Sequence, residues 1–304
     1  MKGIIPREIL YKILNNIYNE YRDNIEEYYK ILHSCMLHLH ISSICYPSND
    51  DIFLLSDSNL NLESLELEDC RILTALKLIS NKNFTDVTLQ NIVINSKKLV
   101  HLNIGRQARF TKIGYKYLIK CCPKLKILQI SHSNALSDNF FIDWTKYSKD
   151  NNDLEILEIK HCNSITNKGI QQILMNSLNL KKLSFTISNT INLDIFKMND
   201  NCCKNIEYLE IDNSDYDKYE LSIFQLTRAV KKIPHLKVLT LIASVKIGSL
   251  RFLPKLIEAS PSLEKLYILP LSLSSSLKYE NLRNEIKNYN INNPEQKLKV
   301  YLYN

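Results

Sequence analysis

Leucine and isoleucine residues recur along most of the chain in one frame, L-x-x-L-x-[LIF]. In the second half of each frame, apolar and intervening positions alternate with a period of two, which predicts a short strand with one buried face. Successive frames start 26 to 30 residues apart. They begin at Leu73, Leu99, Leu125, Leu154, Leu180, Ile206, Leu236 and Leu263, and an atypical ninth frame at Leu298 is predicted to cap the C-terminal end. This regularity predicts a stack of similar units.

The segments between the frames share a second pattern. Thr85-Asp86 and Thr166-Asn167 stand at the same offset from their frames and suit the first residues of a helix. Behind them, apolar residues follow at helical spacing, as in Ile170, Ile173 and Leu174. Each unit is therefore predicted to be a strand, a loop, an amphipathic helix and a polar turn. Stacked copies give an α/β horseshoe solenoid, with parallel strands inside and helices outside.

This pattern divides the chain into three parts. Residues 73–304 are predicted to form the solenoid with its C-terminal cap, and residues 1–45 do not share the repeat. Residues 46–72 are a linker or an irregular first repeat. Within them, Leu60–Cys70 contains another frame only eleven residues before the next, and it is compatible with either a strand or a helix of the linker.

The N-terminal part is predicted to form two short helices. Pro6 suits the first turn of a helix, and Ile9, Leu10, Ile13 and Leu14 then build one broad apolar face. A second apolar-rich stretch, from residue 28 to residue 39, follows a charged turn. Such helices either cover the open end of the solenoid or bind another protein.

Two stretches of the repeat region carry a resemblance to a known family. CCPKLKILQI at Cys121–Ile130 and HCNSITNKGI at His161–Ile170, together with the 26-residue period, resemble the cysteine-containing class of leucine-rich repeats. The resemblance covers roughly residues 73–269. It implies a solenoid that binds other proteins.

The N-terminal part resembles a second family. IPREILYKILNNI at Ile5–Ile17 is similar to the opening of an F-box, L-P-x-E-[IL]-L-x-x-I-[FL], and Leu32–Leu37 is similar to its later L-x-x-C-x-x-V helix. His38-Leu39-His40 departs from the usual V-x-[RK]-x-W ending. The positions that match the opening are Ile5, Pro6, Glu8, Ile9, Leu10, Ile13 and Leu14.

Together the two resemblances imply a substrate receptor of an SCF-type cullin–RING ubiquitin ligase. The implied partners are the adaptor and cullin of that complex and an unknown substrate protein, and other subunits would carry out catalysis. The residues implied to bind the adaptor are Ile5, Pro6, Ile9, Leu10, Ile13 and Leu14. Two alternatives remain open: a non-catalytic interaction scaffold whose N-terminal helices only cap the solenoid, and an enzyme with a pocket of histidine and acidic groups.

The alternation within each strand predicts which side chains face the concave surface. Apolar residues gather in the later repeats beside acidic ones, a composition that is typical of a protein-binding site. The predicted partner-binding residues are Tyr208, Glu210, Asp212, Val238, Thr240, Ile242, Lys265, Tyr267 and Leu269. Scattered surface apolar residues are also common without any function, and the following loops could cover Ile242 and Leu269.

Composition narrows the function classes. The five glycines are too dispersed for a phosphate-binding loop or a G-x-S-x-G elbow, and the net charge of +7 is scattered rather than gathered into a basic stripe, so neither a nucleotide cofactor nor nucleic acid is expected. No apolar run is long enough to span a bilayer, so no membrane association is expected. The charged N-terminus argues against a signal peptide, and the eight cysteines are then expected to be reduced thiols in the cytosol or nucleus.

Metal chemistry is not expected either. Cys121-Cys122 and Cys202-Cys203 are adjacent pairs, which suit packing rather than zinc binding. The acidic stretch from Asp212 to Glu220 lacks a calcium-loop pattern. A denser group could hold zinc, but its histidines would not share one face of the predicted helix. That group is His33, Cys35, His38, His40 and Cys45.

Overall fold

A computed structural model describes residues 38–42, 64–68, 75–79, 84–95, 99–105, 109–147, 153–198, 200–214, 222–243, 250–270, 276–293 and 297–302. The predicted F-box-like helix at Ile5–Ile17 and its adaptor-binding residues lie outside these ranges, as does Leu32–Leu37. Of the histidine- and cysteine-rich group, only the backbone of His38 and His40 is described.

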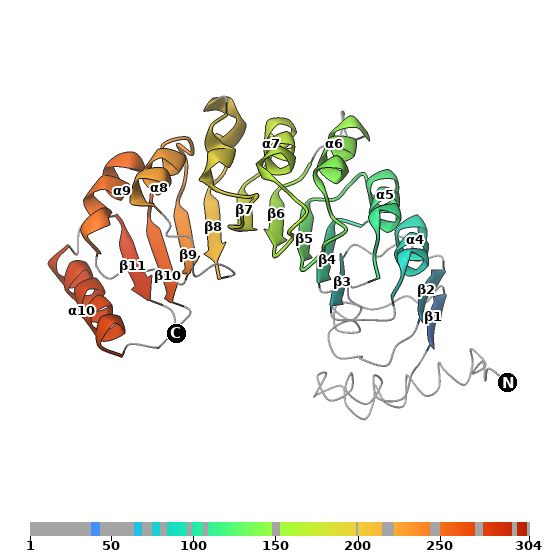
Figure 1. The fold of residues 1–304 in the computed structure, drawn as a ribbon, viewed down its shortest axis with the longest axis horizontal. Helices are drawn as coiled ribbons and strands as arrows, with labels where there is room; N and C mark the ends of the chain where they lie inside the picture. The colour runs from blue at the N-terminus through green and yellow to red at the C-terminus, as the bar shows by residue number, and fades with distance from the viewer. Residues whose placement is uncertain are drawn as a thin grey trace.

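Nine parallel strands form one sheet in the described residues, and they follow one another in chain order (Figure 1). Every predicted frame contributes one strand, including the ninth. The strands are β3 (Ala75–Ile79), β4 (His101–Gly105), β5 (Ile127–Ser131), β6 (Ile156–Lys160), β7 (Lys182–Thr186), β8 (Tyr208–Asn213), β9 (Val238–Ala243), β10 (Lys265–Pro270) and β11 (Lys299–Leu302).

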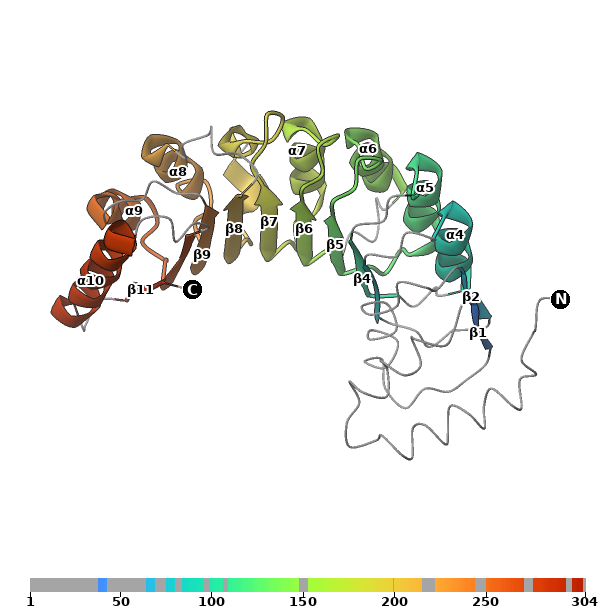
Figure 2. The same cartoon turned by 60° about the horizontal axis from the view of Figure 1, so that its bottom comes forward.

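The helices form an outer layer on one side of this sheet. Figure 2 shows the strands on the inner side of an arch and the helices on its outer side, as predicted for a horseshoe solenoid. The helices are α4 (Asp86–Asn95), α5 (Lys112–Cys121), α6 (Asp138–Tyr147), α7 (Asn167–Asn176), α8 (Ile223–Val230), α9 (Leu253–Ala259) and α10 (Ser276–Asn292), with 3₁₀ turns η1 (Leu193–Phe196), η2 (Asp200–Cys203) and η3 (Leu250–Phe252). Among the described helices, none is both long enough and apolar enough to cross a membrane.

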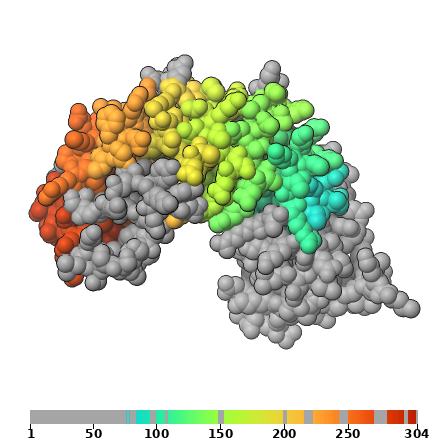
Figure 3. Space-filling view, in the orientation of Figure 1, coloured from blue at the N-terminus to red at the C-terminus, as the bar shows by residue number. Residues whose placement is uncertain are grey.

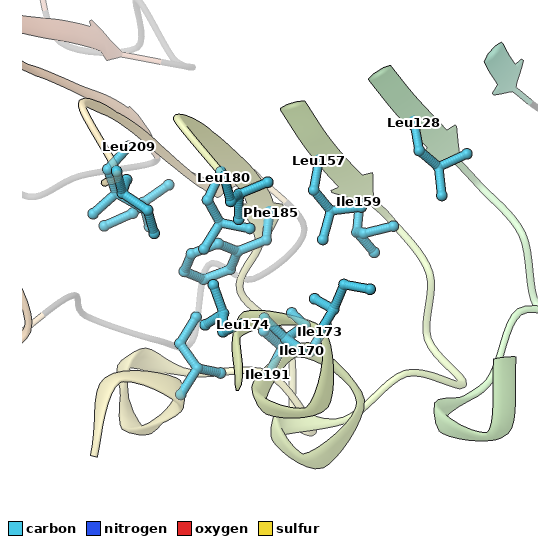
Figure 4. Close-up of a cluster of buried hydrophobic side chains, with 14 of the residues drawn as sticks. Leu128, Leu157, Ile159, Ile170, Ile173, Leu174, Leu180, Phe185, Ile191 and Leu209 are labelled. Atoms are coloured by element: carbon cyan, nitrogen blue, oxygen red, sulfur yellow. The ribbon is translucent and has the colours of Figure 1, made fainter. Parts of the chain in front are cut away.

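One continuous hydrophobic core lies between the two layers. The frame residues Leu157 and Ile159 point from β6 toward Ile170, Ile173 and Leu174 on α7, and all five are fully or almost fully buried (Figure 4). The alternation of each frame therefore buries its leucines against the helix of the same unit. Since each unit is open on both sides, its neighbours complete its core.

The connection between β7 and β8 differs from the predicted unit. In its described part it contains only the 3₁₀ turns η1 and η2 where an amphipathic helix was expected. Asn192 caps η1 by accepting a hydrogen bond from the Asp194 amide (2.8 Å). Ile191, Leu193 and Ile195 are buried at every second position, a spacing that a single α-helical face cannot bury. The general prediction of a helix in every unit is therefore wrong here.

The residues before β3 also differ from expectation. His38–Ser42 form strand β1, which pairs in parallel with β2 (Ser64–Glu68) in a separate two-stranded sheet. His38 and His40 were expected on the second N-terminal helix, and that part of the prediction is wrong. The strand forms by pairing with β2, which lies more than twenty residues farther along the chain, and a local pattern does not reveal such a partner. Of the two alternatives for Leu60–Cys70, the strand is present.

Polar contacts between successive units fix the spacing of the helix layer. The Thr166 amide and hydroxyl both donate to the carboxylate of Asp138, the first residue of the preceding helix α6 (2.8 and 2.7 Å). Thr166 also caps α7 by accepting from the Lys168 amide (3.1 Å), which confirms the predicted cap. Thr111 contacts Asp86 in the same way between α5 and α4. These contacts join α4 to α5 and α6 to α7 in the outer layer.

Candidate protein-binding surface

The strand register aligns the outward-facing positions into columns, as predicted. His101 pairs with Ile127, and Lys182 pairs with Tyr208 in the first column. The central column includes Gln129 beside Glu158. Adjacent side chains within a column come from neighbouring strands of the sheet and so lie close enough to interact.

The middle strands carry a chain of hydrogen bonds across the concave face. His101 Nε2 lies 2.8 Å from Gln129 Oε1, and Gln129 Nε2 donates to Glu158 Oε2 (2.6 Å). Lys182 Nζ donates to Glu158 Oε1 (2.5 Å). Burial alone would favour the neutral form of Glu158. The hydrogen bonds from Lys182 and Gln129 and the charges of Lys182 and Lys160 outweigh this, so the pKa of Glu158 lies below its ordinary value.

A second polar group lies beside this chain. Lys160 forms an ion pair with Glu210, and the Ser184 hydroxyl donates to the same carboxylate (2.9 Å). Burial lowers the pKa of Lys160, but the hydrogen bond and charge of Glu210 raise it further, and the pKa ends above its ordinary value. The polar groups of β5 to β8 thus satisfy one another, and a partner would gain little by replacing these contacts.

The C-terminal strands present a different surface. A hollow of about 580 Å³ opens over β6 to β10 on the strand side of the solenoid. Figure 3 shows the arched outline of the described repeats. Tyr208, Val238 and Tyr267 contribute the apolar lining of this hollow. Tyr208 is 44% exposed, and the ring of Tyr267 stacks on that of Tyr301 with centroids 5.0 Å apart. This part of the concave face therefore offers aromatic and aliphatic side chains to a partner.

Comparison with solved structures tests the architecture. The chain is similar to a chain of the yeast Rad7–Elc1 complex, with a TM-score of 0.52 and 15% identity over 92% of this chain and 85% of that one. Its similarity to the leucine-rich repeat-containing protein LegL7 of Legionella pneumophila has a TM-score of 0.45 and 14% identity, over 92% and 87% of the two chains. The fold is that of a leucine-rich-repeat solenoid. No family model and no curated protein matches the sequence.

Most of the predicted partner-binding residues line the hollow over β6 to β10, which we term the concave hollow. They are Tyr208, Glu210, Val238, Thr240, Lys265 and Tyr267. Ile242 and Leu269, farther along the strands, are half-buried and lie outside the lining. The sequence analysis missed Tyr301, which the pairing of β11 with β10 places beside Tyr267. The ninth frame, which starts at Leu298, puts Tyr301 at an inward position, and this register is wrong by one residue. Val300 pairs with Leu266 and is buried instead, so Tyr301 faces outward.

Asp212 does not belong to the exposed surface, and its prediction is corrected. Its carboxylate is buried, accepts a hydrogen bond from the Ser214 amide (2.9 Å) and lies 3.7 Å from His161 Nε2. The ring of His161 stacks on that of His132, and both residues have a φ of 53°. Asp212 therefore helps to order the turns at the ends of the solenoid strands.

Charged residues of alternating sign occupy the position just before each of the strands β5 to β10. Lys126 and Lys181 both bind Glu155 (3.0 and 2.9 Å), Lys237 binds Glu207 (2.9 Å), and Lys297 binds Glu264 (3.1 Å). Together these residues form what we term the edge ladder, defined as Lys126, Glu155, Lys181, Glu207, Lys237 and Glu264. The acids that line the hollow are thus already paired within the solenoid.

The cysteines of the solenoid are packing residues. Cys122 and Cys203 are buried, whereas Cys121 and Cys202 are partly exposed. Burial raises the pKa of both buried thiols to about 12. Burial also raises the pKa of Cys162, to about 11. In the part of the chain that the structure describes, no three His, Cys, Asp or Glu side chains converge as a metal site.

Proposed function

We propose that the C-terminal half of the concave face binds a partner protein. The observation that carries this proposal is the hollow lined by Tyr208, Val238 and Tyr267, next to strands whose polar side chains already bind one another. Exposed aromatic residues give large contact energies at protein interfaces. Lys265, which is exposed and pairs with Val238 in the register of β10 and β9, adds a positive charge to the lining. A partner segment with apolar side chains and an acidic residue would suit this hollow.

We further propose that this partner is the substrate of an SCF-type ubiquitin ligase, for which the chain is the receptor. The F-box resemblance of Ile5–Ile17 supports a docking role for the N-terminal part, with Ile9 and Leu14 on its apolar face. One of the similar structures, that of yeast Rad7, was solved together with a second protein, Elc1. The chain would supply no catalytic group, and it would act in the cytosol or nucleus by holding the substrate near the catalytic subunits.

Affinity purification from a eukaryotic lysate, followed by quantitative mass spectrometry, tests both parts. Wild type should capture an adaptor, a cullin and a set of further proteins. Ile9→Asp/Leu14→Asp should lose the adaptor and cullin but keep the further proteins. Tyr208→Ala/Tyr267→Ala should do the reverse. Tyr147→Ala is the matched control, because it removes a tyrosine of the outer layer that is 62% exposed.

The outcomes separate the two parts of the proposal. If folded wild type captures neither adaptor nor cullin, the ligase function is wrong and the alternative is an interaction scaffold with capping helices. If the captured proteins are the same for wild type and for Tyr208→Ala/Tyr267→Ala, the hollow is not the binding site.

A further inference from the structure

The outer layer of the solenoid is interrupted between α7 and α8. Where other units have a helix of seven to seventeen residues, the described part of this unit has only η1 and η2, each of four residues. Beside these short turns, a hollow of about 540 Å³ opens between η1 and α8. Its walls, η1 and α8, belong to the outer layer, and Figure 1 shows α8 outside the strands of the sheet.

Apolar side chains line both walls of this outer hollow. Leu193, Phe196 and Met198 come from the η1 side, and Phe224 and Ala229 come from α8. Phe224 is 73% exposed, the highest value among the large apolar side chains that the structure describes. Its helix is already anchored to the core through Leu226 and Val230, which are buried on another face. An exposed phenylalanine at the rim of a hollow is a common anchor for a partner segment.

The same lining is rich in positive charge. Arg228 follows Phe224 by one helical turn and Lys232 follows Arg228 by four residues, so the three lie along one side of α8 and the turn after it. Lys197 lies on the opposite wall and binds Asp194 at 2.7 Å. The described lining thus has three cationic side chains and one carboxylate, and that carboxylate is already paired.

We propose that the outer hollow is a second docking site, for a segment of a partner protein that presents an apolar side chain flanked by carboxylates. The apolar side chain would pack against Phe224 and Met198, and the carboxylates would pair with Arg228, within the positive lining to which Lys232 also belongs. Charge complementarity selects this occupant over a basic or neutral segment. The site is independent of the concave hollow, so both faces of the arch could hold a partner at once.

Parallel selection of a random twelve-residue peptide display library tests the proposal. One pool is selected on full-length wild type and the other on full-length Phe224→Ser/Arg228→Glu. Peptides that are enriched only on wild type should share a Leu, Ile, Phe or Met with Asp or Glu on both sides. The best of them, made synthetically, should bind Arg228→Glu at least about tenfold more weakly than wild type. Binding should also weaken when the ionic strength is raised.

Matched variants separate this site from others. Ile113→Ser/Lys116→Glu makes equivalent changes on the exposed surface of α5, where Ile113 is 61% exposed, and it should bind the peptide like wild type. Tyr208→Ala/Tyr267→Ala should also leave peptide binding unchanged, which distinguishes failure here from failure of the concave site. Circular dichroism melting verifies that each variant folds, and Arg228→Glu alone serves if the double variant does not.

Three results would overturn the proposal. The first is that no peptide is specific to wild type. The second is that the wild-type-specific peptides lack carboxylates. The third is concentration-dependent self-association that Arg228→Glu abolishes, because the occupant would then be a second copy of the chain.

Discussion

Thr166 holds the carboxylate of Asp138 through two hydrogen bonds, although the residues are 28 positions apart in the chain. Both residues stand at the start of a helix, Asp138 in α6 and Thr166 just before α7. The carboxylate therefore lies at the positive end of the next helix, where negative charge is favourable. This single contact joins the local capping of one unit to the stacking of two.

Replacing Asp138 should destabilise the solenoid. Asp138→Ala removes the acceptor for the amide and hydroxyl of Thr166, and the free energy of unfolding should fall by about 1–3 kcal/mol. Urea denaturation followed by circular dichroism measures the change. Asp153→Ala is the control, because Asp153 is exposed, and its free energy of unfolding should stay within about 0.5 kcal/mol of wild type.

Gly169→Ala should also be destabilising, against the usual helical preference for alanine of about 1 kcal/mol. A Cβ at position 169 would lie 2.3 Å from Asp138 Oδ1, far inside van der Waals contact. Since the clash is mainly with that carboxylate, the cost of Gly169→Ala should shrink in an Asp138→Ala background. A double-mutant cycle by urea denaturation measures this coupling. Equal costs in the two backgrounds would show that the carboxylate is not the obstacle.

Acid should weaken the concave polar chain through Glu158. Its pKa is lower in the folded state than the ordinary value of 4.5, so the unfolded state takes up a proton first as the pH falls. The stability that Glu158 contributes is therefore complete above pH 4.5 and is lost as the pH falls through the lower folded value. Glu158→Gln should cost about 1–2 kcal/mol at pH 7 and should flatten the dependence of stability on pH below 5.

Denaturation at a series of pH values from 7 to 3 measures this flattening. The exposed Glu258 provides the control, because Glu258→Gln removes a carboxylate without touching the concave chain. A stability profile of Glu158→Gln that parallels wild type down to pH 3 would contradict the role of the ion pair with Lys182.

The thiols should differ in their reactivity. Only the thiolate is nucleophilic, and burial raises the pKa of Cys122 and Cys203 to about 12. At pH 8 iodoacetamide should therefore modify Cys121 and Cys202, which are partly exposed, well before their neighbours. Fragment-ion mass spectrometry of the labelled peptides distinguishes the adjacent residues, and all four should react after unfolding. Equal native rates within either pair would contradict the packing described.

The sequence predicted the repeated parts of the molecule because their signals are local. A frame such as Leu154–Ile159 contains its own period of two, and Thr166 stands just before the helix that it caps. Contacts between residues far apart in the sequence could not be predicted from such local patterns. Strand β1 depends on pairing with β2, which lies more than twenty residues away, and the carboxylate of Asp212 lies against His161 of an earlier unit. The pattern within one unit therefore predicted which positions form the columns of the concave face, but not which of their side chains remain exposed to solvent.

The short turns η1 and η2 show a second limit. The Leu180 and Ile206 frames are separated by the usual 26 residues, so the period alone indicated an ordinary unit. The buried residues Ile191, Leu193 and Ile195 alternate with Asn192 and Asp194, a spacing that does not fit one face of an α-helix. The same departure leaves the outer hollow open beside Phe224.

The edge ladder restricts how such a molecule can change its length. Because the sign of the charge alternates from Lys126 to Glu264, removing one unit would set two like charges side by side, for example Lys126 against Lys181. Removing two adjacent units would instead bring Lys126 next to Glu207, a pair of opposite charge. Within the strands that carry the ladder, we therefore expect a duplication or deletion of an odd number of units to introduce a repulsion, whereas an even number keeps the charges alternating.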